Sequence, residues 1–436
     1  MKDISTPHIS VIIPVWNPGQ GISRCIDSLR NQTLKEIEMI FVDDCGTDDS
    51  MDKVRAAAAE DNRIRIIENE ENIGPGPSRN KGIDAAQGEY LSFVDPDDYV
   101  APDFLQLLYS EAQKKHFDIV KGSILRKKSS GFTVECDEKT NSTIHRRLSI
   151  GMPLFNAFTH EHQSAIYRNE LIRSTNVKYG LSRRGEDSTF LLQVCSQAKS
   201  FSIVDEACYY YCERESSAIQ TMSAHTLDGL IQSTHEQADY VIRELSCNDW
   251  AKKRMEDRFM YVLRELDRYF DSADSKRDLS STINNLRQEW LRLPFHDDSV
   301  KNVFPLYALQ EHGCLLPREP FYSFKWESSN PPMRYAKLLK RWVDYFLEKP
   351  EDASACSQDL LRIIVRAKMA VKGKPYTTYS IEERRQGERL LKTQLERLPY
   401  QLRVKVYCTS VKLLFIHLLP DVIRQRLRNL LEQPLS

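Results

Sequence analysis

The sequence predicts an α/β protein: an open, mostly parallel sheet with helices on both faces, followed by a mainly α-helical C-terminal domain. In the first hundred residues, strand-like and helix-like segments alternate, and the strand-like segments are apolar throughout. This alternation is typical of parallel β-α-β units whose sheet is covered on both faces. From about residue 225, apolar residues instead recur every three or four positions, which is typical of amphipathic helices.

The elements of this pattern can be assigned in order. Four strands are expected at residues 8–15, 36–44, 63–69 and 89–95, and three helices between them at 21–32, 49–60 and 76–88. After a further strand at 117–125, the polar stretch 126–147 is expected to be an irregular loop. Later elements are a helix at 186–198, a strand at 200–214 and helices at 250–270, 333–349 and 380–398. Because domains usually have roughly 100–200 residues, the 436 residues are expected to form two domains, 1–222 and 223–436.

Composition and charge exclude several classes of protein. The formal net charge of -1 gives no basic field that would bind nucleic acid. The cysteines contain no C-x-x-C pair and are expected to be reduced thiols of a cytoplasmic protein. No stretch approaches the roughly 20 apolar residues of a membrane-spanning helix. The basic amphipathic tail at 403–436 is expected to pack on its own domain, with contact to the inner face of the cell membrane as the alternative.

Polar side chains follow the expected strands at the point where each strand ends. These side chains are Asn17, Asp43, Asp44, Asn69, Asn72, Asp95, Asp97 and Asp98. In open α/β sheets, ligands bind beyond the carboxyl ends of the strands. The last three carboxylates repel one another unless a cation binds, and oxygen ligands suit Mg²⁺ or Mn²⁺. For a single aspartate at this position, a helix cap is the alternative interpretation.

The glycine pattern narrows the type of ligand. The loop PVWNPGQ after the first strand matches neither the dinucleotide-binding fingerprint nor the P-loop. A calcium loop counted from Asp95 fails as well, because Val100 stands where glycine is needed and Gln106 where glutamate is needed. We therefore expect a phosphate that binds through the metal ion.

Four ordered motifs carry a resemblance to a known family. ISVIIPVWN, FVDDCGTDDS, ENIGPGPSRNKGIDAAQGEYLSFVDPDDYV and RRGEDSTFLL resemble the motifs of glycosyltransferase family 2, over about residues 8–220. The resemblance implies the GT-A fold, a Rossmann-like open sheet, and an inverting enzyme. It implies transfer of a sugar from a nucleotide-diphosphate sugar, with UDP as the expected nucleotide, to a hydroxyl of a glycan or lipid-linked acceptor. The implied cofactor is Mn²⁺ or Mg²⁺.

The resemblance also implies roles for individual residues. The residues expected to bind the nucleotide sugar are Pro14, Val15, Trp16, Asp43, Asp44, Arg79 and Asp95. Asp97 is the expected metal ligand, with Asp98 close behind it. Asp187 is the expected general base and Glu186 the alternate, although two acids in the first turn of a helix are also favoured by the helix dipole. A carboxylate that takes the proton of the attacking hydroxyl gives inversion in one displacement.

Neighbouring residues have less specific interpretations. Arg183 and Arg184 are expected to form a charged surface turn, with an anionic acceptor as the alternative. His160 and His162 are left out of the ligand set, because imidazoles in a turn are usually surface groups. Two other functions remain as alternatives: a non-catalytic sugar-nucleotide-binding scaffold and a nucleotidyltransferase. The first would lack an intact D-x-D motif and the second would carry a basic Gly-rich loop. A homo-oligomer is left open.

Overall fold

The computed structural model describes residues 6–127, 134–136, 138–158, 161–212, 224–245 and 249–270, together with short pieces beyond residue 284. The chain divides into two compact units, Met1–Ser275 and Lys276–Ser436. In the second unit, the described residues include a pairing of β10 (Tyr307–Ala308) with β11 (Leu316–Pro317) and helical residues at 392–397. The expected helix at 333–349, apart from residue 343, and the basic tail at 403–436 lie outside the described residues.

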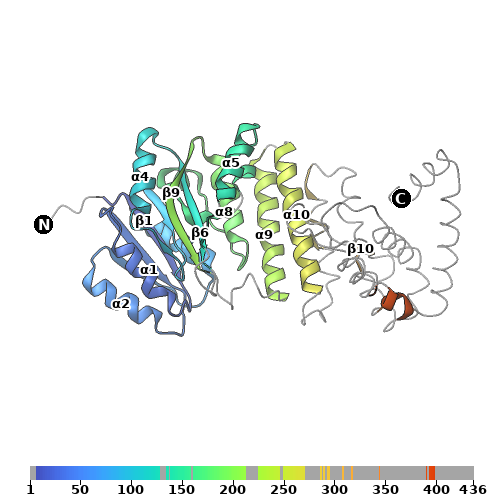
Figure 1. The fold of residues 1–436 in the computed structure, drawn as a ribbon, viewed down its shortest axis with the longest axis horizontal. Coiled ribbons are helices and arrows are strands. Elements are labelled where there is room, and N and C mark those ends of the chain that lie inside the picture. Colours follow the sequence, from blue (N-terminus) through green and yellow to red (C-terminus); the bar gives the residue numbers. More distant parts are fainter. Residues whose placement is uncertain are drawn as a thin grey trace. The chain divides into compact units, whose positions relative to one another are not determined.

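The first unit is built around a mixed sheet, in which the described residues form nine strands (Figure 1). The strands are β1 (Ile9–Val15), β2 (Ile37–Asp43), β3 (Ile64–Glu68), β4 (Tyr90–Phe93), β5 (Tyr99–Val100), β6 (Ile119–Lys127), β7 (Val134–Cys136), β8 (Ala165–Arg168) and β9 (Phe201–Cys212). Their order is β3-β2-β1-β4-β8-β6-β9-β5, with β7 paired to β6. The first four strands in this order are parallel neighbours, as the sequence predicts. β8 then enters antiparallel to both β4 and β6, so the other half of the sheet is mixed.

Helices cover both faces of this sheet. In the first unit they are α1 (Gly21–Arg30), α2 (Ser50–Glu60), α3 (Pro75–Ala85), α4 (Phe104–Lys115), α5 (Glu138–Ser149), α6 (Leu154–Ala157), α7 (Asn169–Thr175), α8 (Glu186–Gln197), α9 (Ala224–Glu244) and α10 (Asp249–Phe270), with a 3₁₀ turn η1 (His162–Ser164). Alternate β1 residues such as Val11 and Ile13 join a core with α1, α2 and α4. Ile12 points the other way, toward α3, where a Cβ on Gly82 would lie 2.4 Å from Ile12 Cγ2. The period-two alternation of a strand thus places two helical layers on opposite faces.

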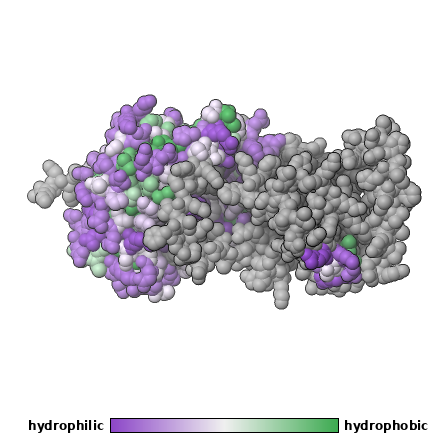
Figure 2. Space-filling model, viewed as in Figure 1, coloured by the Kyte–Doolittle hydropathy of each residue, from purple (hydrophilic) through white to green (hydrophobic). Residues whose placement is uncertain are grey.

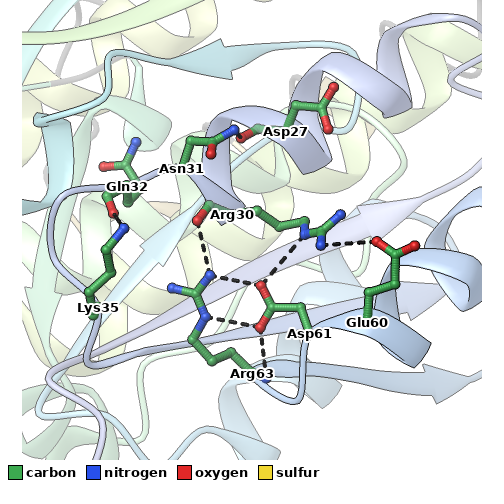
Figure 3. Close-up of polar contacts among 8 residues, drawn as sticks. All are labelled: Asp27, Arg30, Asn31, Gln32, Lys35, Glu60, Asp61 and Arg63. Carbon is green, nitrogen blue, oxygen red and sulfur yellow. Dashed lines mark hydrogen bonds and ion pairs between the residues drawn. The ribbon is translucent and has the colours of Figure 1, made fainter.

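A polar cluster ties α1, α2 and the start of β3 together at the amino end of the parallel strands (Figure 3). Asp61 accepts hydrogen bonds from Arg63 Nη2 at 2.7 Å and Nε at 3.0 Å, and lies 3.6 Å from Arg30. Arg30 also pairs with Glu60 at 3.1 Å. Hydrogen bonds from the Arg63 side chain and backbone outweigh the effect of burial, so the pKa of Asp61 lies below its usual value. The cluster fixes the end of the sheet opposite to the carboxyl ends of the strands.

The polar stretch 126–147 differs from the expected irregular loop, because residues 138–149 form α5. The helix buries Ile144 and Asn141. The Asn141 side-chain oxygen accepts a hydrogen bond from Lys121 Nζ at 3.1 Å, and its nitrogen donates to Asp205 at 2.7 Å. A buried polar network stabilises this helix, and such a network leaves no apolar periodicity in the sequence. The loop prediction was therefore wrong for these residues.

Helices α9 and α10 confirm the amphipathic pattern expected from residue 225 onward. They pack against each other, α9 packs against α8, and α10 packs against α6, all within the first unit (Figure 1). On the face that Figure 2 presents, the surface of the described residues is mainly hydrophilic, with small hydrophobic patches. No helix in the described part of the chain combines the length and apolar character that crossing a bilayer requires. The domain boundary expected at residue 222 stays a prediction.

Candidate active site

The carboxyl ends of β1, β2 and β4 bring the expected site residues to one edge of the sheet. The backbone amide of Asp44 donates to Val15 O at 2.9 Å, so the tips of β1 and β2 remain joined beyond their last paired residues. Pro14 and Val15 are buried, whereas Trp16 at the tip of β1 is 58% exposed. An exposed indole at this edge is available for a planar ligand. The nucleotide-binding role of these three residues stays a prediction.

Asp44 organises the loop between β3 and α3. Its buried carboxylate accepts hydrogen bonds from Asn69 Nδ2 at 2.9 Å, from the amide of Ile73 at 2.8 Å and from the amide of Gly74 at 2.9 Å. Asp43 instead accepts from the amide of Cys45 at 3.0 Å. Asp44 therefore shapes the entry into α3, and contact of Asp43 or Asp44 with a nucleotide base stays a prediction.

Arg79 on α3 connects two motifs that lie far apart in the sequence. Its Nη2 donates to Asp95 Oδ1 at 2.7 Å, and its Nη1 donates to Glu186 Oε1 at 3.0 Å. Burial of the guanidinium lowers its pKa, but Asp95, Tyr179 and Glu186 outweigh burial, so the pKa of Arg79 is raised. The guanidinium also lies over the Tyr179 ring, 5.2 Å from its centroid. The structure thus brings the D-x-D motif and the candidate base motif to the same buried cation.

Glu186 and Asp187 begin α8 but have different surroundings. Glu186 is buried, and its pKa is raised to about 7 because burial and the Asp187 charge outweigh its bond to Arg79. Asp187 is half-buried, and its Oδ1 accepts a hydrogen bond from the Ser188 amide at 2.7 Å. Gly185, just before the helix, has φ +81°, a conformation that favours glycine. Asp187 is therefore the more accessible carboxylate of the pair.

The D-x-D carboxylates have protein partners that the sequence analysis did not include. Tyr209 Oη donates to Asp98 Oδ2 at 2.8 Å, and the amide of Cys212 donates to Asp98 Oδ1 at 2.8 Å. Burial, followed by the charges of Asp95 and Asp97, raises the pKa of Asp98 well above its usual value. Asp95 is paired with Arg79. Repulsion among the three carboxylates therefore does not by itself require a cation.

Asp97 is half-buried and lies at the N-terminus of α1. A Cβ on Gly21, the first residue of α1, would lie 2.7 Å from Asp97 Cα, so only glycine allows this close approach. Arg24 donates to the backbone carbonyl of Asp97 at 3.3 Å and lies over the Tyr99 ring, 4.7 Å from its centroid. The turn that carries Asp97 is thus held by α1. Among the described residues, no three His, Cys, Asp or Glu side chains converge as a metal cluster.

His162 is a site residue whose burial the sequence did not reveal. It is 3% exposed, and its ring packs against Phe93 and Tyr179, with centroid distances of 6.0 and 5.4 Å. Neither ring nitrogen has a hydrogen-bond partner among the described residues. Burial, followed by the Arg79 charge, lowers the pKa of His162 to about 4. The expectation of an ordinary surface imidazole was therefore wrong for His162, whereas His160 lies outside the described residues.

The two arginines before the base motif are anchored in the protein. Arg183 donates to Asn72 Oδ1 at 2.6 Å and to Asn72 O at 3.0 Å, which joins the loop after β3 to the loop before α8. Arg184 lies 3.7 Å from Glu265 of α10. The exposed side chain of Arg183 agrees with a charged surface turn, and the alternative of an anionic acceptor stays open.

Comparisons with known proteins identify the family. The profile described as glycosyl transferase family 2 matches residues 10–175. EpsJ, an uncharacterized glycosyltransferase of Bacillus subtilis, is 33% identical over 316 residues, which are 67% of this chain and 89% of EpsJ. The chain belongs to glycosyltransferase family 2. The motif resemblance is thereby confirmed, and with it the GT-A interpretation of the fold.

Two other similar proteins have lower sequence identity to this family 2 glycosyltransferase. A poly(ribitol-phosphate) beta-glucosyltransferase of Bacillus spizizenii is 28% identical over 294 residues, which cover 65% of this chain but 44% of that protein. The crystal structure of S. aureus TarS in complex with UDP-GlcNAc matches with a TM-score of 0.49 and 21% identity, covering 68% of this chain and 83% of that one.

Proposed function

We propose that this glycosyltransferase transfers a sugar from a nucleotide-diphosphate sugar, with UDP as the expected nucleotide, to a hydroxyl of a glycan or lipid-linked acceptor. The observation that carries the proposal is the double pairing of Arg79 with Asp95 and Glu186. One guanidinium holds the D-x-D motif, where the donor is expected, next to the carboxylates that would activate the acceptor. Family membership supports the same reaction class.

Asp187 is the proposed general base and Glu186 the alternate. A hydroxyl is a weak nucleophile at neutral pH, and a carboxylate that accepts its proton during attack lowers the barrier. Attack on the face of the sugar opposite to the leaving diphosphate inverts the anomeric carbon in a single displacement. Glu186 is engaged by Arg79 and buried, so its part is to keep Arg79 in place, while half-buried Asp187 meets the acceptor.

Asp97, with Asp98 behind it, is the proposed site for Mn²⁺ or Mg²⁺. The donor set fits, because these cations prefer carboxylate oxygens and complete a sparse protein site with water and substrate phosphates. Each oxygen of Asp98 keeps a second lone pair beside its hydrogen bond to Tyr209 or Cys212. When bound, the cation would stabilise the negative charge that the diphosphate gains on leaving.

A kinetic comparison tests the base. Nucleotide sugars are screened for thermal stabilisation, because binding of the correct donor raises apparent stability, and the best one is used for turnover measurements. We expect Asp187→Asn to lower kcat by about 10²–10⁴-fold while donor binding in calorimetry is retained. Asp52→Asn, on the exposed face of α2, is the matched control and should keep wild-type turnover. Near-wild-type turnover in Asp187→Asn would refute the base assignment.

Two further outcomes test the metal and the alternative functions. We expect EDTA-treated protein to lose turnover and regain it with Mn²⁺, and Asp97→Asn to weaken Mn²⁺ binding in a paramagnetic resonance titration. Full turnover after EDTA treatment would contradict the metal proposal. Exchange of pyrophosphate into a nucleotide sugar would favour a nucleotidyltransferase, and donor binding without any turnover would favour a scaffold.

The acceptor is proposed as a polymer or lipid-linked intermediate of polysaccharide or glycoconjugate biosynthesis. The name of the poly(ribitol-phosphate) beta-glucosyltransferase, one of the similar proteins, supports a polymeric acceptor. Attachment of the 403–436 tail to the inner face of the cell membrane is part of this proposal as the minor alternative. Flotation of the full chain with anionic liposomes tests it, and absence from the lipid fraction would remove it.

A further inference from the structure

Helix α10 places two buried arginines against the start of α8, the helix that carries Glu186 and Asp187. Arg254 and Arg258 are one helical turn apart and are 6% and 7% exposed. Neither arginine forms an ion pair with a carboxylate among the described residues. Removing a cation from water without such a partner is costly.

Arg254 is connected to Asp187 through one residue. Its Nη2 donates to Ser188 Oγ at 3.1 Å and to the Ser188 carbonyl at 3.3 Å. The Ser188 amide in turn donates to Asp187 Oδ1 at 2.7 Å. The same Nη2 lies 3.4 Å from Gln237 Oε1 on α9, so both helices of the α9–α10 hairpin take part. Ser188, the residue whose amide donates to the Asp187 carboxylate, is thus held by Arg254 of α10.

Arg258 supports the turn just before the base motif. It donates to Thr234 Oγ1 at 3.0 Å, to Leu230 O at 3.2 Å and to Ser233 Oγ. Gly185 lies against this group, because a Cβ there would meet Ser233 Oγ at 2.7 Å and Arg258 Nη2 at 2.9 Å. The left-handed turn at Gly185 and the start of α8 therefore rest on Arg258 and its α9 partners.

The two arginines also act on Asp187 through their charge. Burial, followed by the neighbouring Arg258, lowers the pKa of Arg254 to about 10, and the Asp187 charge opposes that decrease. Burial likewise lowers the pKa of Arg258, and Tyr261 and Asp187 oppose it. The other ionisable groups that face Asp187 are Glu186 on the same helix, His162 on η1, Tyr167 on β8 and Tyr179 in the loop before α8.

We propose that Arg254 and Arg258 are positioning residues for the catalytic carboxylate, so that the α9–α10 hairpin completes the active site from outside the sheet. Arg254 fixes Ser188 and through it the Asp187 carboxylate, and Arg258 fixes the Gly185 turn. The inference rests on the proposed role of Asp187 as the base. It assigns a function to helices that lie beyond residues 10–175, where the family profile matches.

The test compares Arg254→Met and Arg254→Lys with Lys253→Met in the full chain. Lys253 is the neighbouring residue on α10 with an exposed side chain, so its variant removes the same charge away from the site. We expect Arg254→Met to lower kcat by about 10–100-fold, in line with the cost of a misplaced catalytic group, with the KM for the donor unchanged. Arg254→Lys should restore part of the lost kcat, and Lys253→Met should match wild type.

A double-mutant cycle with Asp187→Asn separates this inference from the proposed function. If Asp187 is the base, adding Arg254→Met to Asp187→Asn should lower the residual turnover no further, since the two act as a unit. An inactive Asp187→Asn with a fully active Arg254→Met would overturn the inference and leave the proposed function standing. An active Asp187→Asn would refute the proposed base itself. If Arg254→Met lowers turnover by the same factor in the wild-type protein and in Asp187→Asn, the role of Arg254 is purely structural. That result would overturn the inference.

If Arg254→Met does not fold, Ser188→Ala provides the second variant. It removes the Oγ acceptor of Arg254 and leaves α10 unchanged. We expect a severalfold decrease in kcat at an unchanged donor KM and an unchanged melting temperature. A wild-type kcat in Ser188→Ala would overturn the inference.

Discussion

His162 allows a test of the site's electrostatics that does not depend on the substrate. The ring is buried between Phe93 and Tyr179, and neither nitrogen has a hydrogen-bond partner among the described residues. Its pKa is lowered to about 4 from the usual 6.5, chiefly by burial. We therefore consider the variant His162→Leu, which removes the titrating group and costs no hydrogen bond that the described residues show.

The expected effect of His162 follows from its pKa in the folded and unfolded states. Between pH 4 and 6.5 the unfolded chain binds a proton at this histidine and the folded chain does not, so the free energy of unfolding rises with pH. Above pH 6.5 both states are neutral and the contribution is constant. At about 1.36 kcal/mol per pKa unit, the histidine destabilises the fold by about 3 kcal/mol at pH 4 relative to pH 7.

Glu186 has the opposite effect over nearly the same range. Its pKa is raised to about 7 from 4.5, so the folded state holds a proton that the unfolded state releases. The free energy of unfolding therefore falls as pH rises from 4.5 to 7, again by about 3 kcal/mol. The contributions of His162 and Glu186 should nearly cancel between pH 4.5 and 6.5. In His162→Leu, the pH dependence of the free energy of unfolding should be that of Glu186. In Glu186→Gln, it should be that of His162.

Urea unfolding at pH 4.5, 5.5 and 6.5 measures this cancellation. Relative to wild type, His162→Leu should become less stable as pH rises, and Glu186→Gln should become more stable. A change of 3 kcal/mol corresponds to a midpoint shift of about 1 M or more, given the usual dependence on urea. Ile242→Leu, at an exposed position on α9 without a titrating group, is the control and should follow wild type. If His162→Leu followed wild type as well, the burial argument would be refuted.

Two further variants test the partners of the D-x-D carboxylates. Arg79→Met leaves Asp95 and Glu186 without their shared cation. We expect it to lower the free energy of unfolding by about 3–5 kcal/mol in thermal unfolding and to abolish turnover in kinetic measurements. A melting temperature equal to that of wild type would contradict the bridging role. Tyr209→Phe removes the hydroxyl that donates to Asp98. We expect urea unfolding to show that the free energy of unfolding falls by about 1–3 kcal/mol. An unchanged free energy of unfolding would indicate that water replaces the hydroxyl.

The sequence predicts the parallel half of the sheet well, because its strands must be apolar on both faces. Strands such as β1 and β2 are continuous buried runs and do not alternate between apolar and polar residues. The helices between the parallel strands begin and end close to the expected residues. The mixed half is less predictable. α5 is stabilised by Asn141 and its bonds to Lys121 and Asp205, and these contacts depend on segments distant in sequence. Local periodicity contains no information about such partners.

The candidate site shows the same division between local and long-range information. The D-x-D and base motifs are visible as short patterns, but the sequence does not distinguish the environments of Glu186 and Asp187. Their difference arises from Arg79, which pairs with Glu186 and not with Asp187. Arg79 is 107 positions from Glu186 in the sequence. The partners of Asp98 illustrate the same limit, since Tyr209 is 111 positions away. The argument that strand-tip carboxylates need a cation therefore applies most directly to Asp97.

The packing of α9 and α10 on α8 bears on where the catalytic unit ends. Buried polar residues of the hairpin, including Ser233, Thr234 and Gln237, contact Arg254 or Arg258 and would be lost from a chain that stops at the predicted boundary, residue 222. α8 would then expose the surface that it buries against α9. We expect a chain that ends at Ser275 to keep donor-dependent turnover and cooperative unfolding, and a chain that ends at residue 222 to lose both. Equal activity of the two chains would show that the hairpin is dispensable and that residue 222 is the functional boundary after all.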